Sequence, residues 1–144
     1  MKKNGILHVE LMRALTAARH KDTIVILDAG MPIPDGCNVI DLALVKGIPS
    51  FLDTIKAVLN EIVVEHYAVF EPMIQYNPQM YETVQKILCR QTSAALSQQE
   101  FIEIMKTSKA VIRTADFGSC CNLILYSASG MDRYVDKYDL SFEP

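Results

Sequence analysis

The sequence predicts a single α/β domain with a largely parallel central sheet. Short apolar runs, which are typical of buried strands, alternate along the chain with stretches whose apolar residues recur at helical spacing. The 144 residues are about the length of one domain, and no internal repeat, low-complexity segment or linker interrupts them. We therefore expect one domain over residues 1–144, with a polar and aromatic tail of unknown role at 132–144.

The first elements are a helix followed by two strands. Residues 9–18 predict a helix, because their apolar side chains fall on one helical face. Residues 23–29, TIVILDA, form a nearly continuous β-branched run, which is typical of a strand covered on both faces. After a loop at 30–39, the alternating segment IDLAL at 40–44 predicts a short strand.

The middle of the chain predicts a second helix and another strand. Pro49 is expected early in this helix, because proline is favoured in the first helical turn. The residues that give the helix its apolar face are Phe51, Leu52, Ile55, Val58 and Leu59. The apolar run at 62–70 predicts the next strand.

Two further helices begin at recognisable capping signals. The segment 77–88 opens with Asn-Pro, an N-cap followed by a proline at the first helical position. The segment 97–107 opens with serine and has glutamate three residues later, the pattern of a capping box. Strands at 110–114 and 122–127 complete the predicted sheet.

Charge and composition argue against several kinds of partner. The net charge of −3 gives no basic surface for nucleic acid, and no apolar stretch reaches the roughly 18 residues of a membrane span. The chain begins with two lysines, as signal peptides do, but His8, Glu10 and Arg13 interrupt the apolar run that would follow. The four cysteines show no CxxC spacing, so we expect free thiols in a reducing cytoplasm.

Motifs for cofactors and metals are missing from the sequence. There is no GxGxxG and no GxxxxGK[ST], so phosphate-cradling loops have no support. The three histidines, His8, His20 and His66, are scattered without the spacing of zinc ligands. We therefore expect neither a cofactor nor a bound metal.

An imidazole and a carboxylate stand at the two ends of the strand predicted at 23–29. His20 precedes the strand, and Asp28 lies at its carboxyl end, where ligands bind in open α/β sheets. About six residues of strand span roughly 20 Å, so the two side chains are distant within one chain. They are either a surface histidine with a turn-capping aspartate, or two parts of one site. A shared site would require the end of the first helix to fold back, or a second copy of the chain to supply one of the two residues.

Several segments together resemble a known family. In order along the chain they are MKKNGIL, HKDTIVILDAGMPIPDG, IDLAL, GIPSF, AVIRT and CNLIL. This ordered set is similar to the D-ribose pyranase and L-fucose mutarotase family over residues 1 to about 128. DAGMPIP together with KGIPSF places the chain nearer the ribose branch.

The resemblance implies a fold, an assembly and roles for particular residues. It implies a three-layer α/β/α domain and a ring-shaped homo-oligomer, often a decamer, with sites at subunit interfaces. His20 would transfer the proton, Asp28 would bind sugar hydroxyls, and Asn122 would bind the sugar beside it. No cofactor is implied, and the partners are a monosaccharide and further copies of this chain.

The chain departs from the family pattern at the rim of the site. Gln98 stands where the ribose branch has a histidine, and Ile102 stands where it has a lysine. The family's Tyr-Ala-Asn is Cys120-Cys121-Asn122 here, so an aromatic hydroxyl is lost. Gln98, Cys120 and Cys121 are therefore candidate substrate-binding residues, and Cys120 is either a small wall of the site or a reactive thiol.

Two functions remain open at this point. The first is a cytoplasmic isomerase of carbohydrate metabolism, which interconverts cyclic forms of a free sugar such as D-ribose or L-fucose by acid–base opening of the hemiacetal. The second is a catalytically weak sugar-binding or regulatory homologue. His20 favours the first, and the missing tyrosine at position 120 favours the second.

Overall fold

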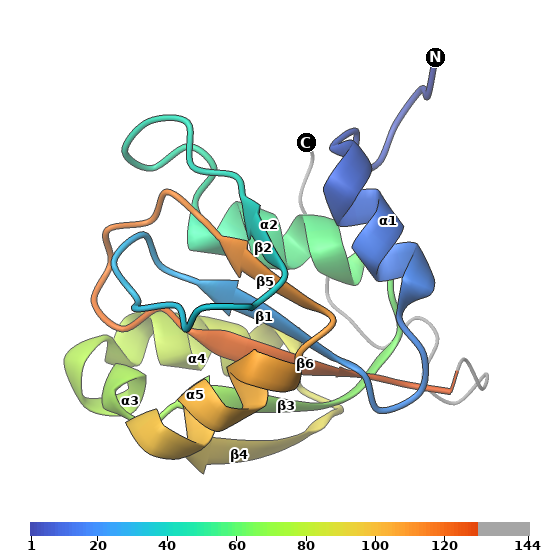
Figure 1. Ribbon diagram of the computed structural model, residues 1–144. Coiled ribbons are helices and arrows are strands. Elements are labelled where there is room, and N and C mark those ends of the chain that lie inside the picture. Colours follow the sequence, from blue (N-terminus) through green and yellow to red (C-terminus); the bar gives the residue numbers. More distant parts are fainter. Residues whose placement is uncertain (130–144) are drawn as a thin grey trace.

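The computed structural model describes residues 1–129, so the predicted tail at 132–144 lies outside the described residues. Within them, helices flank a six-stranded sheet (Figure 1). The strands are β1 (Thr23–Leu27), β2 (Val39–Asp41), β3 (Val64–Phe70), β4 (Thr92–Leu96), β5 (Ala110–Arg113) and β6 (Leu123–Ser127). The helices are α1 (Val9–Ala17), α2 (Phe51–Leu59), α3 (Pro72–Tyr76), α4 (Pro78–Ile87) and α5 (Gln98–Thr107).

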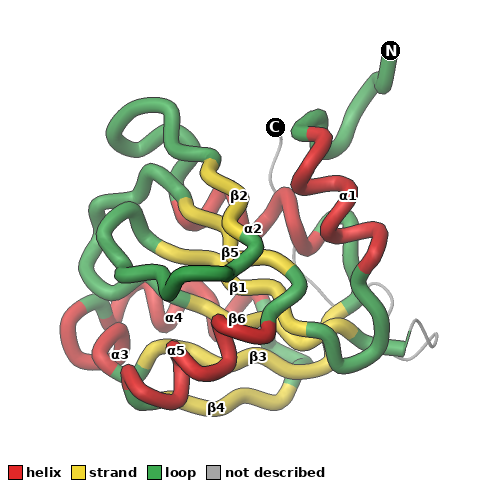
Figure 2. Tube along the Cα trace, viewed as in Figure 1, coloured by secondary structure: helices red, strands yellow, loops and turns green. Residues whose placement is uncertain are grey.

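The order of strands across the sheet is β2-β5-β1-β6-β3-β4. β2 and β1 are parallel to β5, and β4 is parallel to β3, whereas β6 runs antiparallel to both β1 and β3. The predicted largely parallel sheet is confirmed. Because β6 runs the other way, its first residues lie at the same edge of the sheet as the carboxyl ends of its neighbours (Figure 1). Figure 2 shows the strands of this sheet in yellow, with helices in red on both sides.

Two apolar layers cover the sheet. Ile24 and Ile26 of β1 pack in the layer formed with α1, α2 and α4, whereas Val25 and Leu27 pack in the layer formed with α5. All four side chains are fully buried, and burying one side chain of this size stabilises a fold by about 1.5–3 kcal/mol. The strand covered on both faces and the three-layer α/β/α architecture are confirmed.

Side chains cap the helices where the sequence predicts. Asn77 Oδ1 accepts a hydrogen bond from the Met80 amide at 3.3 Å at the start of α4. At the start of α5, the Ser97 hydroxyl accepts from the Glu100 amide at 3.3 Å, and the Glu100 carboxylate accepts from the Ser97 amide at 2.8 Å. Each cap contributes on the order of 1 kcal/mol.

All five predicted strands are shorter than expected, by one to two residues, and for the first two the cause is a side-chain hydrogen bond. The strand predicted at 23–29 ends at Leu27, because the next amide, that of Asp28, donates to the side chain of Asn122 and not to a neighbouring strand. The strand predicted at 40–44 is Val39–Asp41, because the Asp41 carboxylate accepts from the Ala43 amide and turns the chain.

The boundaries around α2 also differ from expectation. Pro49 lies outside the helix, which begins at Phe51, because the Ser50 hydroxyl accepts from the Asp53 amide and makes Ser50 the N-cap. The strand predicted from residue 62 begins at Val64.

The sequence patterns missed α3 and β4. β4 is an edge strand whose small, mostly exposed residues have no apolar alternation, so the usual signal of a strand is lacking. α3 has five residues, and its one sequence signal is the proline at its first position. In the described part of the chain, no helix is long and apolar enough to cross a membrane.

Candidate sugar-binding site

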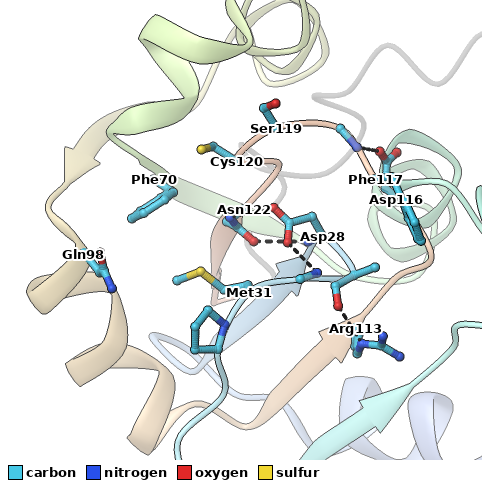
Figure 3. A pocket seen from close by; sticks show the side chains of 14 residues that line it. Asp28, Met31, Phe70, Gln98, Arg113, Asp116, Phe117, Ser119, Cys120 and Asn122 are labelled. Carbon is cyan, nitrogen blue, oxygen red and sulfur yellow. Dashed lines mark hydrogen bonds between the residues drawn. The ribbon is translucent and has the colours of Figure 1, made fainter.

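A pocket of about 560 Å³ opens at the edge of the sheet where β1, β3 and β5 end and β6 begins (Figure 3). The loops at 28–32 and 116–120 form much of its wall. A volume of this size is usual for a small-molecule site, and the carboxyl edge of an open α/β sheet is the usual place for one.

A hydrogen-bonded pair, Asp28 and Asn122, lies at the centre of the pocket (Figure 3). Asp28 follows β1 and Asn122 precedes β6, and the antiparallel pairing of these strands brings them together. Asn122 Oδ1 accepts from the Asp28 amide at 3.1 Å, and Asn122 Nδ2 donates to Asp28 Oδ2 at 3.2 Å. Because the first bond fixes the orientation of the buried amide, its NH₂ group faces the carboxylate.

The pocket raises the pKa of Asp28 above its ordinary value. The main cause is burial, which disfavours the charged form, and the nearby charge of Asp116 acts in the same direction. Backbone hydrogen bonds from Gly30 and Met31 and the side-chain bond from Asn122 oppose the shift. The result is a partly desolvated carboxyl group held in one position, which suits it to bind hydroxyl groups.

The second carboxylate of the pocket, Asp116, holds the loop in place. Asp116 Oδ2 accepts from the amide of Phe51, the first residue of α2, at 2.9 Å, and Oδ1 accepts from the Gly118 amide at 2.7 Å. A carboxylate is favoured at a helix N-terminus because of the helix dipole. These bonds fix the loop at 116–120, and with it the approach to Asn122.

The sequence reasoning missed two pocket residues that end strands. Arg113 ends β5, and its Nε donates to the Ala29 carbonyl at 3.0 Å while Nη1 contacts both Asp41 oxygens at 3.1 and 3.2 Å. Phe70 ends β3 and packs edge-on against Phe101, with ring centroids 5.6 Å apart. Both residues could have been predicted as site candidates from their positions at the ends of strands, since ligands bind beyond the carboxyl ends of strands.

The structure brings four predicted site residues together: Asp28, Gln98, Cys120 and Asn122 all line the pocket. Cys121 does not line it. This residue is fully buried in the apolar layer under α1, α2 and α4, and Asn77 Nδ2 donates to its sulfur at 3.2 Å. Burial raises the pKa of the Cys121 thiol to about 12.

The backbone conformation of Cys120 separates it from its neighbour. Cys120 has a φ of 56°, in the left-handed region that non-glycine residues seldom adopt. After this turn Cys120 faces the pocket while Cys121 enters the core. Burial, with a contribution from Asp28, raises the pKa of the Cys120 thiol, so the group stays protonated and fits a wall better than a nucleophile.

His20 lies at the other end of β1, outside the pocket of its own chain. It occupies a turn in which the Asp22 amide donates to the Arg19 carbonyl at 3.0 Å and Lys21 has a φ of 70°. The imidazole is about half exposed, and its Nε2 lies 3.1 Å from the nearer Glu65 oxygen. In the described part of the chain, no three His, Cys, Asp or Glu side chains gather as a metal site requires.

The fold and pocket define a class: an α/β protein with a small-molecule pocket at the carboxyl edge of its sheet, where a carboxyl group and an oriented amide lie beside apolar walls. A comparison with family models is more specific. Residues 1–129 match the model of the RbsD / FucU transport protein family, and this chain belongs to that family.

Individual relatives agree with this assignment. The chain is 46% identical to a D-ribose pyranase of Geobacillus thermodenitrificans over 127 residues, which cover 88% of this chain and 96% of the relative. It is 40% identical to a D-ribose pyranase of Laribacter hongkongensis, with 88% and 97% of the two chains covered. The structure of Bacillus subtilis RbsD complexed with D-ribose matches with a TM-score of 0.84 and 38% identity, covering 89% of this chain and 98% of the other.

Proposed function

We propose that this protein is an isomerase that interconverts cyclic forms of a free monosaccharide, either pyranose and furanose or the α and β anomers. The observation that carries the proposal is the 46% identity to a D-ribose pyranase over nearly all of both chains. The pocket around Asp28 and Asn122 supplies hydrogen-bonding groups suited to a sugar. D-ribose and L-fucose are the first sugars to test.

The reaction requires proton transfer alone. A base takes the proton of the anomeric hydroxyl, the bond between C1 and the ring oxygen breaks with its electron pair going to oxygen, and an acid protonates that oxygen. The open aldehyde then closes when a hydroxyl attacks either face of C1, with the proton transfers reversed. The sugar gains and loses no atoms or electrons, so acid–base side chains are sufficient.

The candidate residues divide between catalysis and binding. His20 is the catalytic residue, because an imidazole can both take and give a proton near neutral pH. Asp28 and Asn122 hold sugar hydroxyls at the centre of the pocket, while Gln98 and Cys120 form its rim. Cys121 does not contact the sugar; its buried side chain packs the loop at 116–120 onto the core.

The separation of His20 from the pocket supports a homo-oligomer in which one subunit's His20 reaches the pocket of another. Exposed apolar side chains of Phe117 in the pocket wall, and of the loop whose Gly47 amide donates to the Ala115 carbonyl, also favour subunit contacts. They are Leu44, Val45, Ile48 and Phe117, each more than half exposed. A ring of up to ten subunits in the cytoplasm is the assembly proposed, and the four free cysteines agree with a reducing compartment.

Light scattering is expected to show an oligomer at micromolar concentration, because a monomer cannot place His20 in a pocket. A monomer that retains full activity at the same concentration would contradict the shared site.

Treatment with EDTA followed by dialysis is expected to leave the rate of interconversion unchanged, because hemiacetal opening needs proton transfer alone. The rate is measured by NMR exchange between anomeric signals before and after treatment. Loss of the rate, with recovery on adding zinc or magnesium, would contradict this chemistry.

A second candidate function is sugar binding without efficient catalysis. Cys120 favours it, because this position has a tyrosine in the family pattern and a protonated thiol replaces the phenol here. Saturation-transfer NMR on a panel of pentoses, 6-deoxyhexoses and hexoses separates the two. Faster exchange for one sugar supports the isomerase, whereas saturable binding with no added exchange supports the binding protein.

A further inference from the structure

The contact between His20 and Glu65 extends the proposed function. We propose that Glu65 is a positioning residue, which holds the proton of His20 on Nε2 and leaves Nδ1 to exchange a proton with the sugar. The inference rests on the proposed role of His20 in proton transfer.

A β-bulge directs Glu65 toward His20. In the pairing of β3 with β6, Val64 lies opposite Ser127 but His66 lies opposite Tyr126, so Glu65 is the extra residue of β3. A bulge breaks the regular alternation of side chains and re-aims the extra one, and bulges are common next to active sites. The Glu65 carboxylate is thereby brought to the turn before β1.

The turn that carries His20 is attached to the same part of β6. The Lys21 amide donates to the Ser127 carbonyl at 2.8 Å, and the Ser127 amide donates to the Asp22 carbonyl at 2.9 Å. Ser127 also pairs with Val64, the residue before Glu65. One strand residue therefore anchors both the turn and the bulge, which fixes the backbones of His20 and Glu65 relative to each other.

The contact itself determines which nitrogen carries the proton. His20 Nε2 lies 3.1 and 3.2 Å from the two Glu65 oxygens. An ionised carboxylate only accepts hydrogen bonds, so Nε2 must be the donor. In the neutral ring Nδ1 then has the free lone pair, and within residues 1–129 no hydrogen bond occupies it.

The charge of Glu65 also assists the proton transfer. When Nδ1 takes the proton of an anomeric hydroxyl, the ring becomes an imidazolium, and the carboxylate on Nε2 stabilises that positive charge. The Glu65 side chain is 21% exposed and the His20 side chain 47%. The carboxylate is therefore the more sheltered partner, and the imidazole remains accessible to a neighbouring subunit.

The test is a double-mutant cycle on a sugar that the wild type converts. Glu65→Ala is expected to lower kcat by about 10- to 100-fold, the range found when a carboxylate that orients a metal-binding histidine is removed. KM should stay within about twofold, because Glu65 does not line the pocket. In a His20→Ala background, Glu65→Ala should cause no further loss, because its effect passes through the imidazole.

Two variants complete the design. Glu65→Gln should recover part of the lost rate, because its amide oxygen can still accept from Nε2 without supplying the charge. Glu82→Ala, which removes a glutamate from an ion pair with Lys86 on α4, should leave kcat unchanged.

The outcomes separate the two proposals. If Glu65→Ala matches the wild type while His20→Ala is slow, the positioning role is wrong and the proposed function stands. An equal loss from Glu65→Ala with and without His20 would also overturn the positioning role. If His20→Ala matches the wild type, the catalytic assignment itself fails.

Discussion

Replacing His20 with alanine is expected to slow ring interconversion by about 10²- to 10⁴-fold, the range typical of a general acid–base residue. Sugar affinity should change far less, because Asp28 and Asn122 still form the centre of the pocket. The rate is measured by saturation transfer between anomeric signals, with the variant and the wild type at equal concentrations of folded protein.

The matched control for this prediction is another histidine at a chain turn. His8 caps α1 by accepting a hydrogen bond from the Leu11 amide, and His8→Asn keeps a side chain able to cap. The control variant should convert sugar at the wild-type rate. Equal rates for His20→Ala and the wild type would remove His20 from the mechanism, and a large loss in His8→Asn would point to folding or assembly.

The second large effect is expected at Asp28. Asp28→Ala should raise KM by about 10- to 100-fold, which corresponds to the roughly 1.5–3 kcal/mol of a hydrogen bond to a charged group. The substitution also leaves Asn122 Nδ2 without its present partner, whereas the bond from the backbone amide at position 28 to Asn122 Oδ1 remains. Initial rates over a range of sugar concentrations separate KM from kcat.

Asp35→Ala provides the comparison for Asp28. Asp35 is an exposed aspartate in the loop after β1, and it does not line the pocket. Its removal changes the net charge equally but should leave KM unchanged. If Asp28→Ala binds sugar as the wild type does, the sugar does not use this carboxylate, and the pair with Asn122 serves the fold alone.

Local patterns predicted the main helices and the central strands because those elements meet strong local requirements. β1 is buried on both faces, so every residue from Ile24 to Leu27 must be apolar. Polar caps at Asn77 and Ser97 satisfy amides at helix starts, which depends on neighbouring residues only. Local patterns did not predict β4, because an exposed edge strand needs no apolar pattern.

Local sequence patterns predicted fewer of the site residues, because these residues come together only in the fold. Asp28 and Asn122 are 94 residues apart, and only the antiparallel pairing of their strands joins them. Asn122 was predicted from the family resemblance, whereas Arg113 and Asp116 were identified as pocket residues only in the structure. Glu65 could not be linked to His20 from sequence, since the contact depends on a bulge between strands that are not adjacent in the sequence.

The position of β6 bears on how the protein is made. β6 is the last strand of the described chain, yet it lies in the middle of the sheet and joins β2-β5-β1 to β3-β4. During synthesis, β2-β5-β1 and β3-β4 have unpaired edges on β1 and β3 until residues 122–127 leave the ribosome. Open edges invite pairing with other chains. A message truncated before β6 would therefore yield an aggregation-prone product, and its pocket would lack Asn122, which immediately precedes β6.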